Sequence, residues 1–339
     1  MMAAVAHARI SHFETTRLLS GALEDIAATL RSPEKRSAFA SAEPFPHLVL
    51  DGLFPAEVVD ALAVGIPERG NNCHGPGVTC FNRNGFEKGK VQTTALQAMG
   101  PHARAYMEFV RSAAFRRALE GLTGFGGEEL GLVNDEHNEG AGIQTTGPGG
   151  YLKVHADFNG DFGRGGPARR LNTFLYLNPD WDDAYQGHLQ LWSRNMSQCA
   201  REISPILGRF VVFKTTDFTY HGHPVPLNAP EGRVRRSIAA YFYTEGNWRR
   251  DARECLRPNC PSGDHTRCSC PWHNTLWKDA KCALCLHHTM HKPTIKADGR
   301  GACGVGMLRK RKHVVQPHQF GHGPMHEALA RFHGEHVSN

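Results

Sequence analysis

The chain has 339 residues, with 39 Lys and Arg, 33 Asp and Glu, 10 Cys and 21 His, and 40% of its residues are hydrophobic. At roughly 150 residues per domain, this length allows one large domain and a smaller one. The apolar content excludes a chain that is disordered throughout, and the lack of any apolar run of about 18 residues excludes a membrane-spanning helix. The first twenty residues contain no apolar core of a secretory signal. We therefore expect a cytoplasmic protein whose cysteines are thiols or metal ligands rather than disulfides.

Basic residues, cysteines and histidines are concentrated at the C-terminal end. Residues 246–339 carry 15 Lys and Arg against 7 Asp and Glu, whereas residues 1–245 carry 24 against 26. The same 94 residues hold 7 of the 10 Cys and 11 of the 21 His but only 13 Leu, Ile, Val or Phe. So few apolar side chains cannot offset the entropy of ordering the segment. The sequence predicts three parts: an N-terminal support region (1–141), a β core (142–245) and a Cys/His-rich extension (246–339).

Two alternatives remain for the extension. Cys282 and Cys285 have the two-residue spacing of a zinc knuckle, while the other cysteine intervals match no known finger, so the segment either binds zinc or is disordered. The basic run at 308–313 could serve as a nuclear address or contact nucleic acid. Because short basic runs are usually solvated, we do not expect nucleic acid to be a partner. Outside the extension, Cys73 and Cys80 are expected to be ordinary thiols.

The N-terminal part has the apolar periodicity of helices. Spacing of three and four residues predicts helices over 15–31, 55–64 and 101–120, and residues 47–54 predict a short strand. The stretch 66–90 is rich in Gly, Asn and Pro, which indicates a loop.

From Gly142 onward the pattern changes to short apolar runs separated by Gly, Pro, Asn and Asp. These runs are GIQTT, YLKVHADF, LNTFLYLN, GHLQLWS, RFVVFKTT and RSIAAYFYT. Strands at this spacing indicate a sandwich or barrel rather than alternating strands and helices. The predicted fold class is α+β with a mainly β core.

Three residues of this core have the chemistry of a metal site. His155 and Asp157 are two apart in a strand-like run, so they project from the same face. His221 follows another strand, and a barrel can bring it to the same place. Two imidazoles and a carboxylate on one face of a metal form the facial triad of non-heme Fe(II) oxygenases. His223 is the competitor of His221, because an extended strand gives it the same side-chain direction.

Arg236 opens the last strand of the core. Its alternate neighbours Ile238, Ala240 and Phe242 are apolar or small, so we expect Arg236 to face the barrel interior and to need an anion there. A guanidinium binds a carboxylate by two hydrogen bonds. The alternative is an ion pair with an Asp or Glu of the protein.

These blocks, in this order, resemble the prolyl 4-hydroxylase-type branch of the 2-oxoglutarate and Fe(II)-dependent dioxygenases. The resemblance covers residues 142–245 strongly and FPHLVLDGLFPAEVVDAL more loosely. It implies a double-stranded β-helix, or jelly roll, with N-terminal helices packed on the major sheet. It also implies that Fe(II), 2-oxoglutarate and O2 are used, with ascorbate as a further candidate cofactor.

Carried over to this sequence, the resemblance implies that His155, Asp157 and His221 are the iron ligands. Arg236 would pair with the distal carboxylate of 2-oxoglutarate. Tyr176 would contact the same carboxylate, unless it is an aromatic side chain packed in the barrel. The interval from the preceding strand matches His221, whereas His223 would require a shift of two residues.

The sequence also departs from the family pattern. Gln186 and Gly187 stand where many members have two glycines, and His188 follows them. Gln144, Thr145 and Thr146 stand where many members have a tyrosine near the cosubstrate. The expected pocket rims are 66–90 and 158–170. In the second rim, Arg164, Arg169 and Arg170 either meet an acidic substrate or are solvated.

The function implied is hydroxylation of an unactivated C–H bond with oxidative decarboxylation of 2-oxoglutarate. Peptidyl residues of the prolyl type are the first candidate substrates, and amino acids and saccharide-linked compounds are the others; no membrane partner is expected. Two alternatives are a non-catalytic jelly-roll binding protein, suggested by the altered turn at Gln186, and a zinc or nucleic-acid binder acting through residues 246–339.

Overall fold

The computed structural model describes residues 10–66, 77–83, 86–126, 131–134, 140–157, 167–194, 198–216 and 219–245, and the pairs 294–295 and 301–302. The predictions for the extension 246–339, including its zinc site and basic run, lie outside these residues. Within the extension, the structure describes a short antiparallel pair, β12 (Thr294–Ile295) and β13 (Gly301–Ala302). In the described part of the chain, no helix is long and apolar enough to cross a membrane.

The described α-helices all belong to the N-terminal part of the chain. They are α1 (His12–Gly21), α2 (Leu23–Arg31), α3 (Pro33–Ser41), α4 (Ala56–Gly65), α5 (Pro101–Val110) and α6 (Ala113–Thr123). The two long helices predicted over 15–31 and 101–120 are each divided into a pair. The second division follows from Ser112, whose hydroxyl accepts the backbone N–H of Phe115 and so starts a new helix.

The strands form one continuous, strongly curved antiparallel sheet. They are β1 (His47–Leu50), β2 (Val78–Arg83), β3 (Glu87–Thr93), β4 (Leu132–Asn134), β5 (Gly142–His155), β6 (Ala168–Tyr176), β7 (Leu189–Trp192), β8 (Cys199–Ile203), β9 (Phe210–Lys214), β10 (His221–His223) and β11 (Arg235–Thr244). Their order is β1-β9-β6-β11-β5-β10-β7-β8, with β3 on β5, β2 on β3 and β4 on β11. This is the predicted double-stranded β-helix core.

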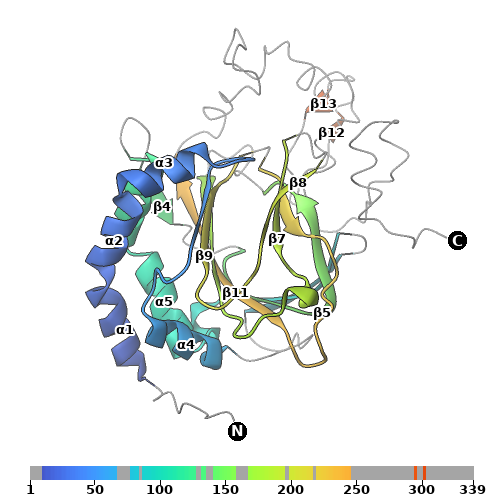
Figure 1. Cartoon of the computed structure of the whole chain (residues 1–339), viewed down its shortest axis with the longest axis horizontal. Coiled ribbons are helices and arrows are strands. Elements are labelled where there is room, and N and C mark those ends of the chain that lie inside the picture. The colour runs from blue at the N-terminus through green and yellow to red at the C-terminus, as the bar shows by residue number, and fades with distance from the viewer. Residues whose placement is uncertain are drawn as a thin grey trace, which may run out of the picture.

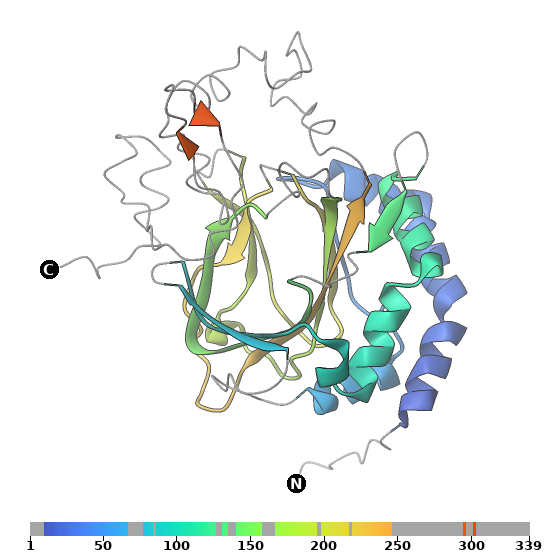
Figure 2. The same ribbon diagram turned by 180° about the vertical axis from the view of Figure 1, so that it is seen from behind.

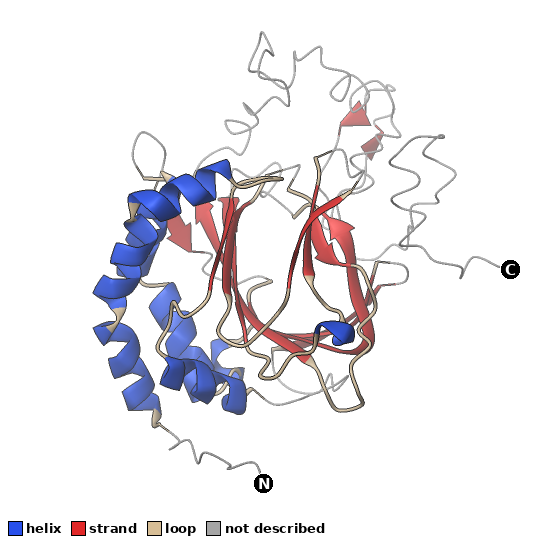
Figure 3. Ribbon diagram, viewed as in Figure 1, coloured by secondary structure: helices blue, strands red, loops and turns tan. Residues whose placement is uncertain are grey.

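Strand β5 joins the two layers of this sandwich. Its first half pairs with β11 through Gly142–Thr146, and its last residues pair with β10 through Leu152 and His155. The major layer therefore contains β1, β9, β6 and β11, and the minor layer contains β10, β7 and β8, which face it (Figure 1; Figure 3). The α-helices cover the outer side of the major layer (Figure 3).

The loop predicted over 66–90 is wrong for its second half. Residues 78–83 and 87–93 form the antiparallel pair β2–β3, and β3 pairs with β5 from Thr93 to Glu87. From behind, this hairpin lies along the sheet away from the helices (Figure 2). Cys80 on β2 is disulfide-bonded, which corrects the prediction of a thiol there, whereas Cys199 on β8 is free.

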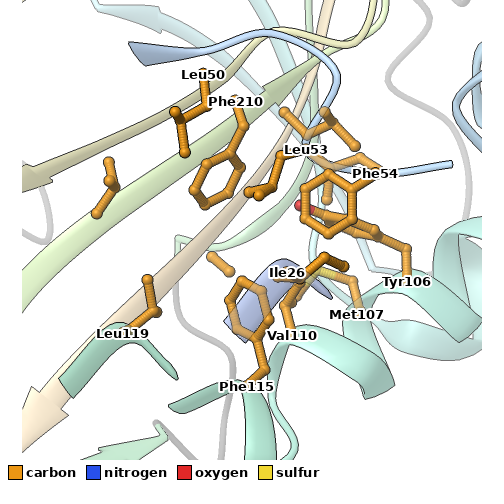
Figure 4. Packing of buried hydrophobic residues seen from close by; sticks show 14 of the residues in the cluster. Ile26, Leu50, Leu53, Phe54, Tyr106, Met107, Val110, Phe115, Leu119 and Phe210 are labelled. Carbon is orange, nitrogen blue, oxygen red and sulfur yellow. The ribbon is translucent and has the colours of Figure 1, made fainter. Parts of the chain in front are cut away.

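Each face of the major layer has its own buried cluster. The outer cluster joins the helices to alternate strand residues, and Phe115 of α6 lies at its centre with ring centroids 6.3 Å from Phe54 and 6.4 Å from Phe210 (Figure 4). The inner cluster lies between the layers and joins Phe174 and Tyr176 of β6 to residues of β7 and β8. Both faces of β11 and β6 are therefore buried, one for packing and one for the site described next.

Candidate active site

The three predicted ligands converge between the two layers. His155 is the last residue of β5, and His221, the first of β10, is directly opposite it in the register. Asp157 lies just beyond the end of β5. One ligand atom from each of the three lies within 4.8 Å of the others. The Nε2 atoms of His155 and His221 are 3.4 Å and 3.5 Å from the two carboxylate oxygens of Asp157.

Backbone carbonyls fix the orientation of both imidazoles. Nδ1 of His155 donates to the carbonyl of Lys153 at 2.7 Å, and Nδ1 of His221 donates to the carbonyl of Thr219 at 2.9 Å. A carbonyl can only accept, so the proton is on Nδ1 and the lone pair of each Nε2 points to the shared centre. Burial lowers the pKa of His221 to about 4, so this ring is neutral at neutral pH, as a metal ligand must be.

Asp157 is held as a carboxylate by its surroundings. Burial alone would raise its pKa, but the neighbouring His221, Arg169 and His155 together hold the pKa well below its ordinary value. Nη1 of Arg169 lies 3.3 Å from Oδ2 of Asp157, and Asn172 donates its side-chain N–H to the same oxygen. The carboxylate is therefore oriented as well as charged.

A β-bulge places Arg169 on this inner face. Along β6 and β11, Leu171 opposes Phe242 but Arg169 opposes Tyr243, so Arg170 has no residue opposite it. The extra residue reverses the alternation. As a result, the guanidinium of Arg169 lies 4.0 Å from the ring centroid of Tyr241, while Arg170 donates to the hydroxyl of Thr244. Of the three arginines expected at the rim, Arg164 lies outside the described residues.

The predicted orientation of Arg236 is wrong. Its Nη1 donates to the carbonyl of Ala63 in α4 at 2.8 Å, on the helical side of the sheet. Ile238 and Phe242, which share its face, belong to the outer cluster. The error has a physical origin: the more apolar face of β11 packs against helices, whereas the face directed into the sandwich carries the polar residues.

Arg235, one residue earlier, occupies the position expected for Arg236. It is only 6% exposed, its Nη2 donates to the hydroxyl of Tyr176 at 3.1 Å, and its Nε donates to the carbonyl of Gly187 at 2.7 Å. Among the described residues, no carboxylate pairs with this guanidinium. A buried cation without a counter-ion is costly, so the arrangement fits an anion supplied from outside the chain.

The unusual turn at Gln186 and Gly187 supports Arg235 rather than disrupting the pocket. Both residues have positive φ, +63° and +78°, and a Cβ on Gly187 would lie 3.1 Å from Cδ of Arg235. Glycine is therefore suited to this close approach. His188 is directed away and lies 2.9 Å from Asp183.

Gln144 and Thr145, where the sequence also departs from the family pattern, lie on opposite faces of β5. Gln144 donates to the hydroxyl of Tyr241 at 3.2 Å, so a tyrosine reaches this region from β11 instead of from β5. Thr145 pairs with Arg236 in the register and so belongs to the helical face. The residues that sequence reasoning missed are Arg235, Asn172 and the inward-facing Arg169. Two consecutive arginines, Arg235 and Arg236, indicated that one of them faces inward. The sequence alone did not indicate which one.

Residues 141–243 match the 2OG-Fe(II) oxygenase superfamily. No curated protein matches the sequence significantly.

Among solved structures, a prolyl-4-hydroxylase from Pseudomonas putida is 18% identical, with a TM-score of 0.44 over 63% of this chain and 100% of that one. A prolyl hydroxylase from Trichoplax adhaerens, solved with a hypoxia inducible factor peptide, is 16% identical, with a TM-score of 0.42 over 69% of this chain and 91% of that one. HygX from Streptomyces hygroscopicus, solved with nickel, 2-oxoglutarate and hygromycin B, is 12% identical, with a TM-score of 0.41 over 63% of this chain and 87% of that one.

The assignment rests on the family match and on the site itself. The matched segment contains all three converging residues and the buried Arg235 with Tyr176. Two oriented imidazoles and one oriented carboxylate suit Fe(II), and a buried guanidinium that pairs with no carboxylate among the described residues suits a dicarboxylic cosubstrate. Residues 141–243, which match the 2OG-Fe(II) oxygenase superfamily, are therefore the oxygenase-like part of this chain.

Proposed function

We propose that the chain is a 2-oxoglutarate- and Fe(II)-dependent hydroxylase in which His155, Asp157 and His221 bind the metal. The observation that carries the proposal is the convergence of their ligand atoms within 4.8 Å on a buried inner face. When bound there, Fe(II) with O2 supplies the oxidation of a C–H bond to an alcohol, while 2-oxoglutarate is converted to succinate and CO2. Because Asp157 supplies a carboxylate ligand to the metal, we favour hydroxylation of the substrate over halogenation.

We further propose that Arg235, and not Arg236, binds the distal carboxylate of 2-oxoglutarate together with Tyr176. Arg235 presents a planar donor group that two protein contacts already hold in place, so little side-chain freedom is lost when the cosubstrate binds. Burial raises the pKa of Tyr176, so its hydroxyl keeps the proton that a carboxylate needs.

The first experiment measures metal binding and turnover separately. Replacing His155, Asp157 or His221 by Ala should abolish tight Fe(II) binding, measured anaerobically by calorimetry, and should reduce succinate release to background. His188→Ala is the matched control, because His188 lies outside the inner site and should leave both measurements unchanged. Metal binding without any consumption of 2-oxoglutarate would instead support the non-catalytic alternative.

For the substrate, we propose a peptidyl residue of the prolyl type. The wall beside Asp157 carries Arg169 stacked on Tyr241, with its guanidinium 5.8 Å from the ring centroid of Tyr243. A guanidinium donates to peptide carbonyls, and aromatic faces pack against an aliphatic ring. This wall supports a polar, chain-like substrate.

A panel of proline-containing peptides, free amino acids and aminoglycosides tests this assignment. Products are scored by mass spectrometry for the addition of one oxygen, alongside succinate release. We expect addition on a peptide and coupling of the two signals. Oxygen addition on amino acids or sugars alone would reject the peptide assignment while leaving the hydroxylase activity intact.

A further inference from the structure

His223 is buried close to the site but is not one of the three residues whose ligand atoms converge. It is the last residue of β10, two positions after His221, and is only 5% exposed. Its Nδ1 atom has no hydrogen-bond partner in the described part of the chain. Buried polar atoms are nearly always hydrogen-bonded, so an unpartnered ring nitrogen in a functional site calls for an explanation.

The position of His223 lies between the two ends of the proposed cosubstrate site. In the register of β10 on β5, His221 opposes His155 and His223 opposes Leu152. His221 and His223 are two apart on β10, so their side chains lie on the same inner face. Because Gly222 opposes Gln190 of β7, His223 lies toward the turn at Gly187, whose carbonyl accepts from Arg235.

The imidazole of His223 can serve as a donor in this pocket. A neutral imidazole with its proton on Nδ1 donates one hydrogen bond without adding a charge. Donors of this kind are suited to a carboxylate that an arginine already neutralises.

We propose that His223 is a third cosubstrate-binding residue, whose Nδ1 donates to the carboxylate of 2-oxoglutarate held by Arg235 and Tyr176. The inference rests on the proposed function and adds selectivity to it. A pocket with three fixed donors distinguishes a keto diacid from a keto monoacid, because the monoacid leaves buried donors unpaired.

The test compares variants that keep or remove a donor at the position of Nδ1. His223→Asn places an amide near that position, His223→Gln places it near Nε2, and His223→Leu removes all donors. Anaerobic calorimetry with Fe(II)-loaded protein measures the affinity for 2-oxoglutarate and for 2-oxobutyrate, which lacks the distal carboxylate.

His223→Leu and His223→Gln should each weaken 2-oxoglutarate binding about tenfold, the effect of losing one hydrogen bond to a charged group. Neither variant should change Fe(II) or 2-oxobutyrate binding, and His223→Asn should bind 2-oxoglutarate nearly as the wild type does. Unchanged 2-oxoglutarate binding in His223→Leu, or equal weakening for both acids, would overturn the inference. Loss of Fe(II) binding would overturn it in favour of a ligand role.

The wild-type protein separates this inference from the proposed function. If the wild type binds Fe(II) but not 2-oxoglutarate, the proposed function and the inference both fail. If the wild type binds 2-oxoglutarate and His223→Leu binds it equally well, only the role of His223 fails.

Discussion

The two faces of the major layer differ in composition although the same strands build them. On β11, Arg236, Ile238 and Phe242 face the helices, whereas Arg235 and Tyr241 face the minor layer. The helical face is almost wholly apolar and has many aromatic contacts. The inner face combines its own smaller apolar cluster with buried charged and amide groups that contact one another. The helical face therefore contributes packing, whereas the inner face contributes both packing and the candidate site.

The largest expected effect is on the helical face. Phe115 is fully buried and packs on Phe54, Phe210 and Phe242. Phe115→Ala should lower the free energy of unfolding by about 3–5 kcal/mol, because it leaves a large cavity. Urea denaturation measures this, with the exposed Phe13→Ala as control, which should change stability by less than about 0.5 kcal/mol. At low urea concentration, the folded fraction of the Phe115→Ala variant should bind Fe(II) as the wild type does. Weaker binding would show that a change on the helical face also alters the inner face.

A second prediction concerns the pH dependence of stability, to which the inner face contributes through His221. His221 has a pKa of about 4 in the folded, metal-free protein and an ordinary value near 6.5 in the unfolded chain, so the unfolded chain binds the proton more tightly. Stability should therefore fall as the pH decreases from about 6.5 to about 4, by on the order of 2–3 kcal/mol from this residue.

Comparison of wild type with His221→Gln isolates this contribution. Urea denaturation of the metal-free proteins at pH 7 and pH 4.5 should show a smaller loss of stability in the variant. Equal losses in the two proteins would assign the acid sensitivity to other groups, such as the buried His47.

The adjacent arginines of β11 give the sharpest comparison. Arg235→Met should weaken 2-oxoglutarate binding about 30-fold, or about 2 kcal/mol, through loss of charged hydrogen bonds. Arg236→Met should leave cosubstrate binding unchanged and should lower the free energy of unfolding by about 1–2 kcal/mol, because carbonyls at the end of α4 lose a donor. Calorimetry and urea denaturation of both variants measure the two effects. A larger loss of cosubstrate affinity in Arg236→Met would restore the role expected from the sequence.

The smallest effect concerns a single hydroxyl. Tyr176→Phe removes the oxygen that accepts from Arg235 but keeps the ring, which is fully buried. We expect a loss of about fivefold in 2-oxoglutarate affinity, or about 1 kcal/mol, with little change in stability. The steady-state KM for 2-oxoglutarate measures it. No change in KM would mean that Tyr176 is a packing residue of the inner cluster.

The sequence was sufficient to predict the jelly-roll class, the strand runs after Gly142 and the gathering of His155, Asp157 and His221. These follow from residue types and spacing, and from a resemblance spread over several blocks. The side of the sheet on which each arginine lies could not be predicted, because both faces of β11 are buried and the apolar face was taken for the interior. The bulge at Arg170 was equally hidden, since one extra residue in a strand leaves no mark in the pattern. The hairpin β2–β3 was missed because Gly and Asn in that stretch resemble a loop.

The main-chain support of Arg235 has a consequence for how the cosubstrate site can change. The carbonyl of Gly187, together with the hydroxyl of Tyr176, fixes the depth at which the guanidinium sits. The backbone at Gln186 and Gly187 therefore helps to set the length of the acid that fits the proposed site. Point substitutions nearby alter the strength of binding, but adaptation to a longer or shorter acid would require inserting or deleting a residue in this turn.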